Sequence, residues 1–350
     1  MANPQSAVSF DEIRSLVTHL PGPDLEAGSA AAARQHKLAK PRGSLGRLEE
    51  IALWMATWQG RHPPVLRRPR ISVFAANHGV AARGVSAYPA EVTAQMMQTF
   101  IDGGGAVNQL SELADADLRV YEMDLDHPTA DFTAGPAMTE DGCARAMAYG
   151  MMAVEPGLHL LCLGEMGIAN TTSAAALCHA LFGGAAADWV GPGTGVDAGG
   201  LARKVAAVEQ GLAANPSAAA DPLEAMRCLG GFELAAIAGA VLAARMAHTP
   251  VLLDGYACTA AAAMLIRLDP RALDHCMVAH RSAEPAHRRL LDAIGKEPIL
   301  DLGMRLGEGS GAALAINVVK AAVACHNDMA TFDQAGVSGP ASAPTSGDRR

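Results

Sequence analysis

A single carboxylate stands in a glycine-rich stretch near the end of the chain. Four glycines surround Glu308, at positions 303, 307, 309 and 311. Because glycine lacks a Cβ atom, this backbone can adopt unusual dihedral angles and can let a flat ligand approach closely. The apolar run 298–302 predicts a strand and the run 312–325 predicts a helix, so Glu308 is expected at the carboxyl end of a strand, where open α/β sheets bind ligands. The residue types favour a catalytic base, although a solvated glutamate on a glycine-rich turn fits the local pattern equally well.

Two segments that follow predicted strands could line a pocket of mixed polar and apolar character. In the stretch 77–97 the chain turns and begins a helix, which would bring Ser86, Tyr88 and Gln95 toward a ligand. The stretch 164–172 ends in three residues of capping type, and helix N-termini beside glycines offer backbone N–H groups to anions. Glu165 in this stretch would either bind ligand hydroxyls or orient the loop, and the sequence leaves both roles open.

Two other segments could hold a phosphate group. A Gly-Thr-Gly turn at 193–195 could wrap an anion with backbone donors, and Lys204 stands on the next helix. Gly255 and Ser282, each just after a predicted strand, could complete the cradle. His280 is interpreted as a hydrogen-bonded structural histidine in preference to a catalytic one. The pattern is neither a Walker A loop nor a GxGxxG fingerprint, so its specificity is low.

The composition of the chain excludes several classes of protein. With 350 residues, a formal net charge of −9 and 4% aromatic residues, it is not expected to bind nucleic acid. Its 12 histidines are dispersed without an HExxH motif, and no GxSxG motif occurs, which argues against metal-dependent and serine hydrolases. The 7 cysteines are scattered singly, as in proteins of reducing compartments. We therefore expect neither a metal ion nor a cofactor.

No membrane or secretory segment is expected. The most apolar helical segment, 234–244, is too short to span a bilayer, and the first residues lack the basic and apolar regions of a secretory signal. These observations predict a cytoplasmic protein that acts on small molecules rather than on membranes.

Six short apolar runs predict the strands of a parallel sheet. Each run ends in glycine or polar residues and is followed by an alanine-rich segment of helical length, which is the alternation expected of βα units. The predicted strands are 71–76, 118–123, 158–163, 250–253, 276–279 and 298–302. Their near-continuous hydrophobicity is typical of strands covered by helices on both faces. The predicted fold class is therefore α/β, with a central parallel sheet flanked by helices.

The rest of the sequence predicts a division into three parts. Residues 1–70 have helical character, with apolar positions on one stripe in 45–54, and predict a smaller helical lobe that the last helix would join. Residues 71–335 would form the α/β core. The stretch 336–350 is rich in Gly, Ser, Pro and Ala and is predicted to be disordered.

Several motifs, in this order along the chain, together resemble one enzyme family. They are His78-Gly79-Val80, Gly84-Val85-Ser86, Glu91-Val92-Thr93, Gly164-Glu165-Met166-Gly167-Ile168, Asn170-Thr171-Thr172, Gly193-Thr194-Gly195, Asp254-Gly255, His280-Arg281-Ser282 and Arg305-Leu306-Gly307-Glu308-Gly309-Ser310-Gly311. The chain resembles the nicotinate-nucleotide:dimethylbenzimidazole phosphoribosyltransferases, over about residues 41–337. That resemblance implies a Rossmann-like parallel sheet with a smaller helical lobe, usually in a homodimer. It also implies transfer of the 5-phosphoribosyl group from nicotinate mononucleotide to 5,6-dimethylbenzimidazole, in cobalamin biosynthesis.

The resemblance further implies roles for individual residues, with Glu308 as the general base. The residues expected around the phosphate are Gly193, Thr194, Gly195, Gly255 and Ser282. The residues expected near the benzimidazole are Ser86, Gln95 and Leu306, and those expected near the ribose and nicotinate are Glu165 and Lys204. The chain departs from the family at Asn77, where family members often have Asp, and at Pro192.

Two other interpretations stay open at this point. A non-catalytic sensor or carrier could keep the fold and bind a nucleotide or a benzimidazole, although the intact Glu308 and glycine loops argue against it. An enzyme of the same reaction class could instead use adenine or another base as acceptor, depending on Asn77 and the segment 86–97. A product assay with several bases would separate these interpretations.

Overall fold

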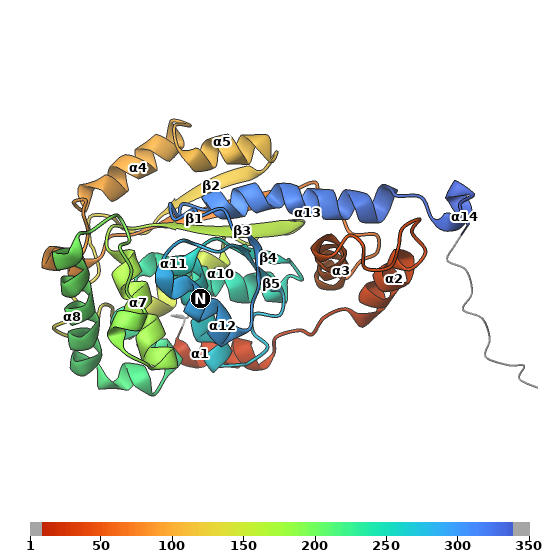
Figure 1. Ribbon diagram of the computed structural model, residues 1–350. Coiled ribbons are helices and arrows are strands. Elements are labelled where there is room, and N and C mark those ends of the chain that lie inside the picture. The colour runs from red at the N-terminus through yellow and green to blue at the C-terminus, as the bar shows by residue number, and fades with distance from the viewer. Residues whose placement is uncertain (1–8, 339–350) are drawn as a thin grey trace, which may run out of the picture. The chain divides into compact units, whose positions relative to one another are not determined.

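A parallel sheet of six strands, in the order β2-β1-β3-β4-β5-β6, forms the centre of the fold (Figure 1). The computed structural model describes residues 9–338. Its strands are β1 (Pro69–Ala75), β2 (Asp117–Glu122), β3 (Leu160–Met166), β4 (Val251–Leu253), β5 (Cys276–His280) and β6 (Pro298–Leu300). Every neighbouring pair is parallel. Each strand overlaps one of the apolar runs, with ends that differ by up to three residues, and the predicted α/β class is confirmed.

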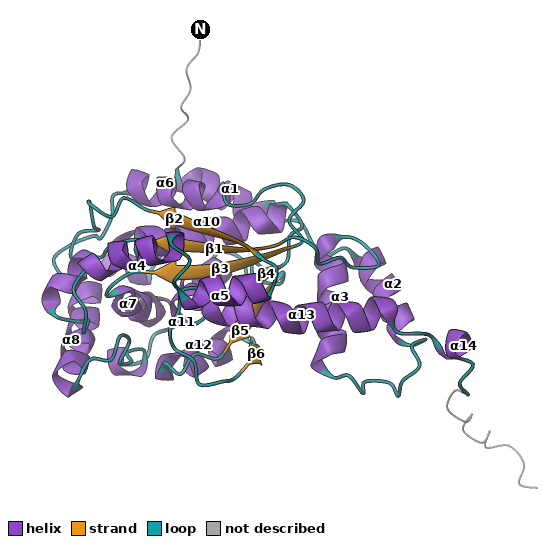
Figure 2. Cartoon of the chain, turned by 90° about the horizontal axis from the view of Figure 1, so that it is seen from above, coloured by secondary structure: helices purple, strands orange, loops and turns teal. Residues whose placement is uncertain are grey.

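Helices connect the strands and cover both faces of the sheet. The α-helices are α1 (Phe10–Thr18), α2 (Leu25–Gln35), α3 (Arg47–Gln59), α4 (Glu91–Ile101), α5 (Ala106–Leu113), α6 (Glu140–Met151), α7 (Asn170–Phe182), α8 (Ala198–Ala214), α9 (Pro222–Leu229), α10 (Phe232–Met246), α11 (Tyr256–Ala263), α12 (Pro285–Ile294), α13 (Ser310–Asp328) and α14 (Phe332–Ala335). Short 3-10 helices are η1 (Gly79–Arg83), η2 (Ala186–Asp188), η3 (Pro216–Ala219) and η4 (Met264–Arg267). Helices α4 and α5 lie over one face, and α7, α10, α11 and α12 lie over the other (Figure 1 and Figure 2).

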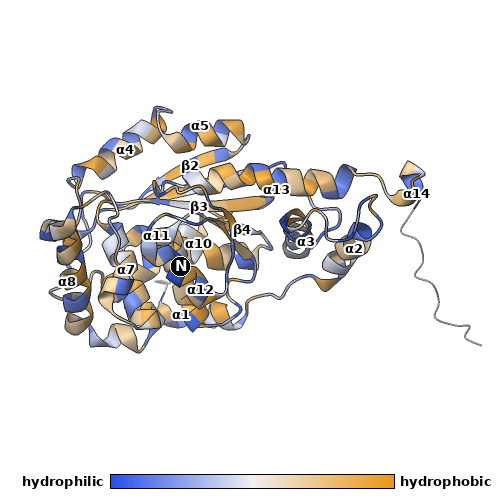
Figure 3. Ribbon diagram, viewed as in Figure 1, coloured by the Kyte–Doolittle hydropathy of each residue, from blue (hydrophilic) through white to orange (hydrophobic). Residues whose placement is uncertain are grey.

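The hydrophobic core sits where this second layer of helices meets the sheet. All seven residues of β1 are buried, and hydrophobic residues run along β3 and β4 (Figure 3). The edge strands differ, since β2 alternates exposed and half-buried residues and β6 is half-buried throughout. Burial on both faces explains the near-continuous hydrophobicity of β3 and β4, and in β1 even the polar residues Arg70 and Ser72 are buried.

Helices α6 and α10 contact each other through their backbones. A Cβ atom on Gly150 would overlap the carbonyl of Ala236, and one on Gly239 would overlap the carbonyl of Met147. Each glycine is therefore required by a close approach of the partner helix rather than by its dihedral angles.

The chain divides into two compact units whose bounds differ from the expected division. The larger unit comprises Met1–Gly22 and Leu66–Val318, and the smaller comprises Pro23–Val65 and Val319–Arg350. Helix α1 was expected in the helical lobe, but it belongs to the larger unit because Phe10, Ile13 and Val17 are buried in that unit's core. Of the predicted disordered tail, residues 336–338 are exposed and the remainder lies outside the described residues.

Candidate active site

A cavity of about 750 Å³ opens at the carboxyl edge of the sheet, within the larger unit. Its walls come from loops that follow five strands, together with the turn before α8. The lining segments lie within 85–96, 165–171, 193–194, 255–257, 280–284 and 305–308. This position and size are typical of small-molecule sites in parallel α/β folds. Such sites lie where the strand order reverses, which in this sheet is between β1 and β3.

Four helices begin at this cavity. The lining residues include those at the starts of α7 and α11 and those immediately before α12 and α13. The N-terminus of a helix presents unpaired N–H groups and a partial positive charge. The cavity is therefore suited to an anionic group such as a phosphate.

Glu308 adopts a backbone conformation that is rare for residues other than glycine. Its φ angle is +62°, between Gly307 at +81° and Gly309 at +75°. The Glu308 N–H group donates a hydrogen bond to the Glu165 carbonyl at 3.1 Å, which holds the loop against β3. A left-handed conformation of this kind costs on the order of 1 kcal/mol or more and is characteristic of functional loops.

The environment of the Glu308 side chain makes its carboxylate a stronger base than usual. The residue is 5% exposed and borders the cavity. Burial, and then the nearby Asp254 carboxylate, raises the pKa of Glu308 from 4.5 to about 7. Glu308 can therefore accept a proton near neutral pH and release it again.

Asp254 fixes the start of α13 beside Glu308. This carboxylate lies just past the end of β4, is fully buried, and accepts hydrogen bonds from the N–H groups of Gly309 at 3.2 Å and Ala312 at 2.8 Å. Burial raises its pKa, while His280, whose Nε2 lies 3.7 Å from Oδ1, and the backbone N–H groups oppose that rise. Asp254 thus acts on Glu308 by position and by charge.

His280 borders the cavity with both ring nitrogens lacking a hydrogen-bond partner among residues 9–338. It is 1% exposed, and a Cβ atom on Gly311 would overlap its ring. Gly311 is thus needed for close packing on His280, rather than for an unusual φ angle. The prediction that His280 is a hydrogen-bonded structural residue is therefore wrong about its hydrogen bonds.

Glu165 contributes a second carboxylate to the same wall. Its Oε2 accepts a hydrogen bond from the Asn170 side chain at 2.5 Å. Burial raises the pKa of Glu165 well above its usual value, opposed by this hydrogen bond and reinforced by the carboxylates of Asp254, Glu233 and Glu308. Burial and the three neighbouring carboxylates therefore all favour the protonated form of Glu165.

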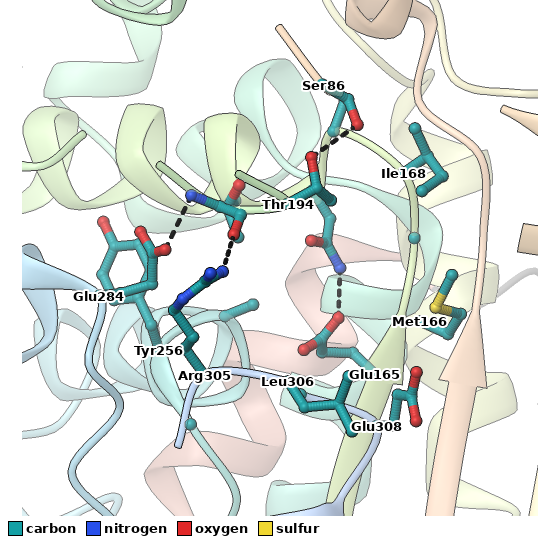
Figure 4. A pocket seen from close by; sticks show the side chains of 18 of the residues that line it. Ser86, Glu165, Met166, Ile168, Thr194, Tyr256, Glu284, Arg305, Leu306 and Glu308 are labelled. Carbon is teal, nitrogen blue, oxygen red and sulfur yellow. Dashed lines mark hydrogen bonds between the residues drawn. The ribbon is translucent and has the colours of Figure 1, made fainter. Parts of the chain in front are cut away.

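A network of hydrogen bonds organises the opposite end of the cavity. The Thr194 hydroxyl lies 3.0 Å from the Ser86 hydroxyl and accepts a hydrogen bond from the Ala87 N–H group at 3.0 Å. Arg305 donates to the Gly193 carbonyl at 2.9 Å, and the Gly193 N–H group donates to Glu284 at 2.8 Å. Figure 4 shows Glu284, Tyr256 and Arg305 at this end, and Glu308 beside Leu306 and Met166 at the other.

The structure brings most of the expected site residues to the cavity. Those that line it are Ser86, Glu165, Gly193, Thr194, Gly255, Ser282, Leu306 and Glu308. Three expected residues do not line it, namely Gln95, Gly195 and Lys204. Lys204 is fully buried behind the wall, where its Nζ donates to the Thr171 hydroxyl at 3.0 Å and the Gly191 carbonyl at 2.8 Å. Burial lowers its pKa to about 8.

Sequence reasoning missed several lining residues. They are Val92, Met96, Met166, Ile168, Glu284 and Arg305, whereas Tyr88, which the sequence places at the pocket, does line it. Gln95 is exposed on α4, whereas Val92 and Met96, four residues apart and hence on one face of that helix, border the cavity. Helical spacing was the signal that could have identified them.

The sequence predicts neither a metal-binding site nor a helix that crosses a membrane. Within residues 9–338, no group of three or more His, Cys, Asp or Glu side chains is arranged to hold a metal ion. No helix in the same part of the chain combines the length and hydrophobicity that crossing a bilayer requires.

Comparison with known proteins gives matches over most of the chain. A family model described as phosphoribosyltransferase matches residues 20–337. A relative from Brucella abortus (strain S19), named nicotinate-nucleotide–dimethylbenzimidazole phosphoribosyltransferase, is 56% identical over 333 residues, which cover 95% of this chain and 98% of the relative. A relative of the same name from Brucella canis has the same identity and coverage. The crystal structure of CobT from Thermus thermophilus matches with a TM-score of 0.82 and 42% identity, covering 89% of this chain and 99% of that one.

Proposed function

The chain belongs to the phosphoribosyltransferase family that includes the nicotinate-nucleotide:dimethylbenzimidazole enzymes, and we propose that it performs their reaction with Glu308 as the general base. It transfers the 5-phosphoribosyl group from nicotinate mononucleotide to 5,6-dimethylbenzimidazole, giving α-ribazole 5′-phosphate and nicotinate, in cobalamin biosynthesis. The observation that carries this proposal is a buried glutamate with a pKa of about 7 on the wall of a cavity where four helices begin.

The acceptor base occupies the end of the cavity near Glu308. Met166, Ile168 and Leu306 give this end apolar surface, and Val92 and Met96 of α4 line the same cavity. A planar, largely apolar base fits such walls, while a single carboxylate can read its ring N–H group. Of the expected base contacts, Leu306 lies at this end. Ser86 lines the cavity but contacts Thr194 at the other end, and Gln95 would need to act from outside the cavity.

The nucleotide occupies the other end, with its phosphate at the helix N-termini. Backbone and hydroxyl groups suited to hold the phosphate come from Thr194, Gly255 and Ser282, and Gly193 shapes the turn beside them while its N–H group donates to Glu284. Lys204 is buried behind this wall, and Gly195 is exposed with its N–H group donating to the Pro192 carbonyl, so both would stabilise the turn rather than touch the ligand. Glu165, between the two ends, faces the region proposed for the ribose and nicotinate.

The chemical step is an attack by an uncharged ring nitrogen of the acceptor on C1′ of the ribose. The C1′–nitrogen bond to nicotinate breaks, its electron pair neutralises the departing pyridinium ring, and configuration at C1′ inverts. Positive charge then accumulates on the acceptor, whose other ring nitrogen loses its proton to Glu308. A positioned base of this kind contributes about 10² to 10⁴ in rate, and alignment of the two substrates supplies much of the remainder.

A product assay tests the proposal directly. Purified protein is incubated with nicotinate mononucleotide and one of several bases, including 5,6-dimethylbenzimidazole and adenine, and the products are identified by mass. Formation of α-ribazole 5′-phosphate and nicotinate is expected with 5,6-dimethylbenzimidazole. Binding of both substrates without any product would instead favour a sensor. Product formation only with a base other than 5,6-dimethylbenzimidazole would assign that base as the acceptor.

We also propose that the protein works as a cytoplasmic homodimer, by its family membership. Light scattering after size-exclusion chromatography should give twice the 36.0 kDa mass of the chain. A mass equal to one chain at micromolar concentration would contradict the dimer.

A further inference from the structure

A buried carboxylate lies inside the subsite proposed for the phosphate. Glu284 directly precedes α12, borders the cavity and is 4% exposed. Its Oε1 accepts a hydrogen bond from the Gly193 N–H group at 2.8 Å, and its own N–H group donates to the Ser282 hydroxyl at 3.2 Å. Oε2 is buried without a hydrogen-bond partner in residues 9–338. Glu284 therefore contacts two of the residues proposed to surround the phosphate.

Two cations act on the Glu284 carboxylate from neighbouring elements. Lys204 on α8 donates to the Gly191 carbonyl at 2.8 Å, and Arg305, in the loop before α13, donates to the Gly193 carbonyl at 2.9 Å. Burial raises the pKa of Glu284, and Lys204, the Gly193 N–H group and Arg305 oppose this rise in that order. Because burial and these cations have opposite effects on the Glu284 carboxyl group, a further negative charge nearby would favour its protonated form.

The other titratable neighbours stay uncharged around neutral pH. Burial lowers the pKa of His287 on α12 to about 3, so its imidazole is neutral. Burial raises the pKa of the Tyr256 hydroxyl on α11 well above its usual value, and this hydroxyl donates to the Trp189 carbonyl at 2.8 Å. Neither group can compensate for an added negative charge at Glu284.

A phosphate in this subsite would stand beside an ionised carboxylate, and like charges in a water-poor site repel strongly. Movement of the carboxylate is limited on one side, because Oε2 packs against Gly191 so closely that a Cβ atom there would overlap it. We propose that Glu284 takes up one proton from solvent when the phosphate of the nucleotide binds, with the proton carried on Oε2. Oε1 then keeps its hydrogen bond to Gly193, and the phosphate meets a neutral carboxylic acid. This inference rests on the proposed function, which supplies the phosphate.

Proton uptake can be measured without turnover. Titration calorimetry of the protein with nicotinate mononucleotide, in buffers of different ionisation enthalpy and without an acceptor base, gives the number of protons bound. We expect an uptake of up to one proton per nucleotide bound, and a Kd that rises with pH wherever this uptake occurs, by at most about tenfold per unit of pH. The riboside, which lacks the phosphate, should bind without this uptake.

The isosteric variant Glu284→Gln identifies the group that is protonated. Its amide oxygen can still accept from Gly193, and it carries no charge, so it imitates the protonated state. We expect loss of the proton uptake and, at pH 8, a Kd for the mononucleotide about tenfold lower than that of the unmodified protein. Glu112→Gln on the exposed surface of α5 is the matched control and should keep the uptake.

Three results would overturn the inference. They are binding of the mononucleotide without proton uptake, uptake that persists in Glu284→Gln, and a variant that weakens mononucleotide and riboside equally, as expected for an ionised acceptor of ribose hydroxyls. Failure of the unmodified protein to bind the mononucleotide at any pH would remove the proposed function and the inference together. Binding with normal turnover but no uptake would remove the inference alone.

Discussion

The rate of the proposed reaction should depend on pH through Glu308. With a pKa of about 7, Glu308 is half ionised at pH 7. Only the ionised form can accept the proton of the acceptor base, so kcat should rise with pH and level off above pH 8. At pH 6 the rate should be roughly one tenth of its plateau, whereas a glutamate with the usual pKa would already be fully active.

The measurement is a pH profile of product formation at saturating nicotinate mononucleotide and 5,6-dimethylbenzimidazole between pH 5 and 9. Saturation matters because the proton linked to Glu284 affects binding of the nucleotide rather than kcat. Glu308→Gln should lower kcat by about 10² to 10⁴ and remove the acid limb, while leaving the Kd of the mononucleotide within a few fold. Glu112→Gln should match the unmodified protein.

Two outcomes would refute this reasoning. A kcat that is flat from pH 5.5 to 8 would show that no group with a pKa near 7 governs the step. Near-normal turnover by Glu308→Gln would show that another residue accepts the proton.

Three further predictions concern the surroundings of Glu308. Asp254→Asn removes a negative charge that raises the pKa of Glu308, so the acid limb of the kcat profile should shift to lower pH; a shift to higher pH would contradict the charge argument. Because folded Glu308 holds its proton up to about pH 7 and the unfolded residue releases it near 4.5, stability should fall as pH rises through that window. Glu308→Gln should therefore be more stable than the unmodified protein at pH 8, by on the order of 3 kcal/mol, and equally stable below pH 4, as checked by urea unfolding. Gly311→Ala would force a methyl group into His280 and should cost about 1–3 kcal/mol of stability and much of the activity, whereas Gly135→Ala, which has open space, should change neither.

The strands of the sheet could be predicted because burial on both faces leaves a direct mark on the sequence. Largely apolar runs ending in glycine or polar residues identify β1, β3, β4 and β5, and the residues after each run indicate the edge of the sheet that binds ligands. The lobe boundary could not be predicted in this way. Helix α1 is amphipathic, and an amphipathic pattern shows which face is buried but not which core it is buried in.

The parts of the site that depend on an unusual backbone could be predicted, because glycine marks them in the sequence. The parts formed by side chains from distant positions could not. The glycines beside Glu308 predicted a loop with unusual backbone dihedral angles. In the structure Gly307, Glu308 and Gly309 all have positive φ angles. Gln95 was chosen for its polarity, although the helical period places Met96 on the cavity side. Glu284 meets Gly193 across 91 positions of sequence, a contact that only the fold creates.

The two ends of the cavity take most of their lining residues from different segments and share the loop 305–308. The wall near Glu308 includes Met166, Leu306 and the side chain of Met96 on α4, whereas the nucleotide end depends on the turn at 193–194 and the segment 280–284. Substitutions in one group can accumulate over generations without disturbing the other. Substitutions at Met96, Met166 and Leu306 could thus change which acceptor base the enzyme uses, while nicotinate mononucleotide remains the donor.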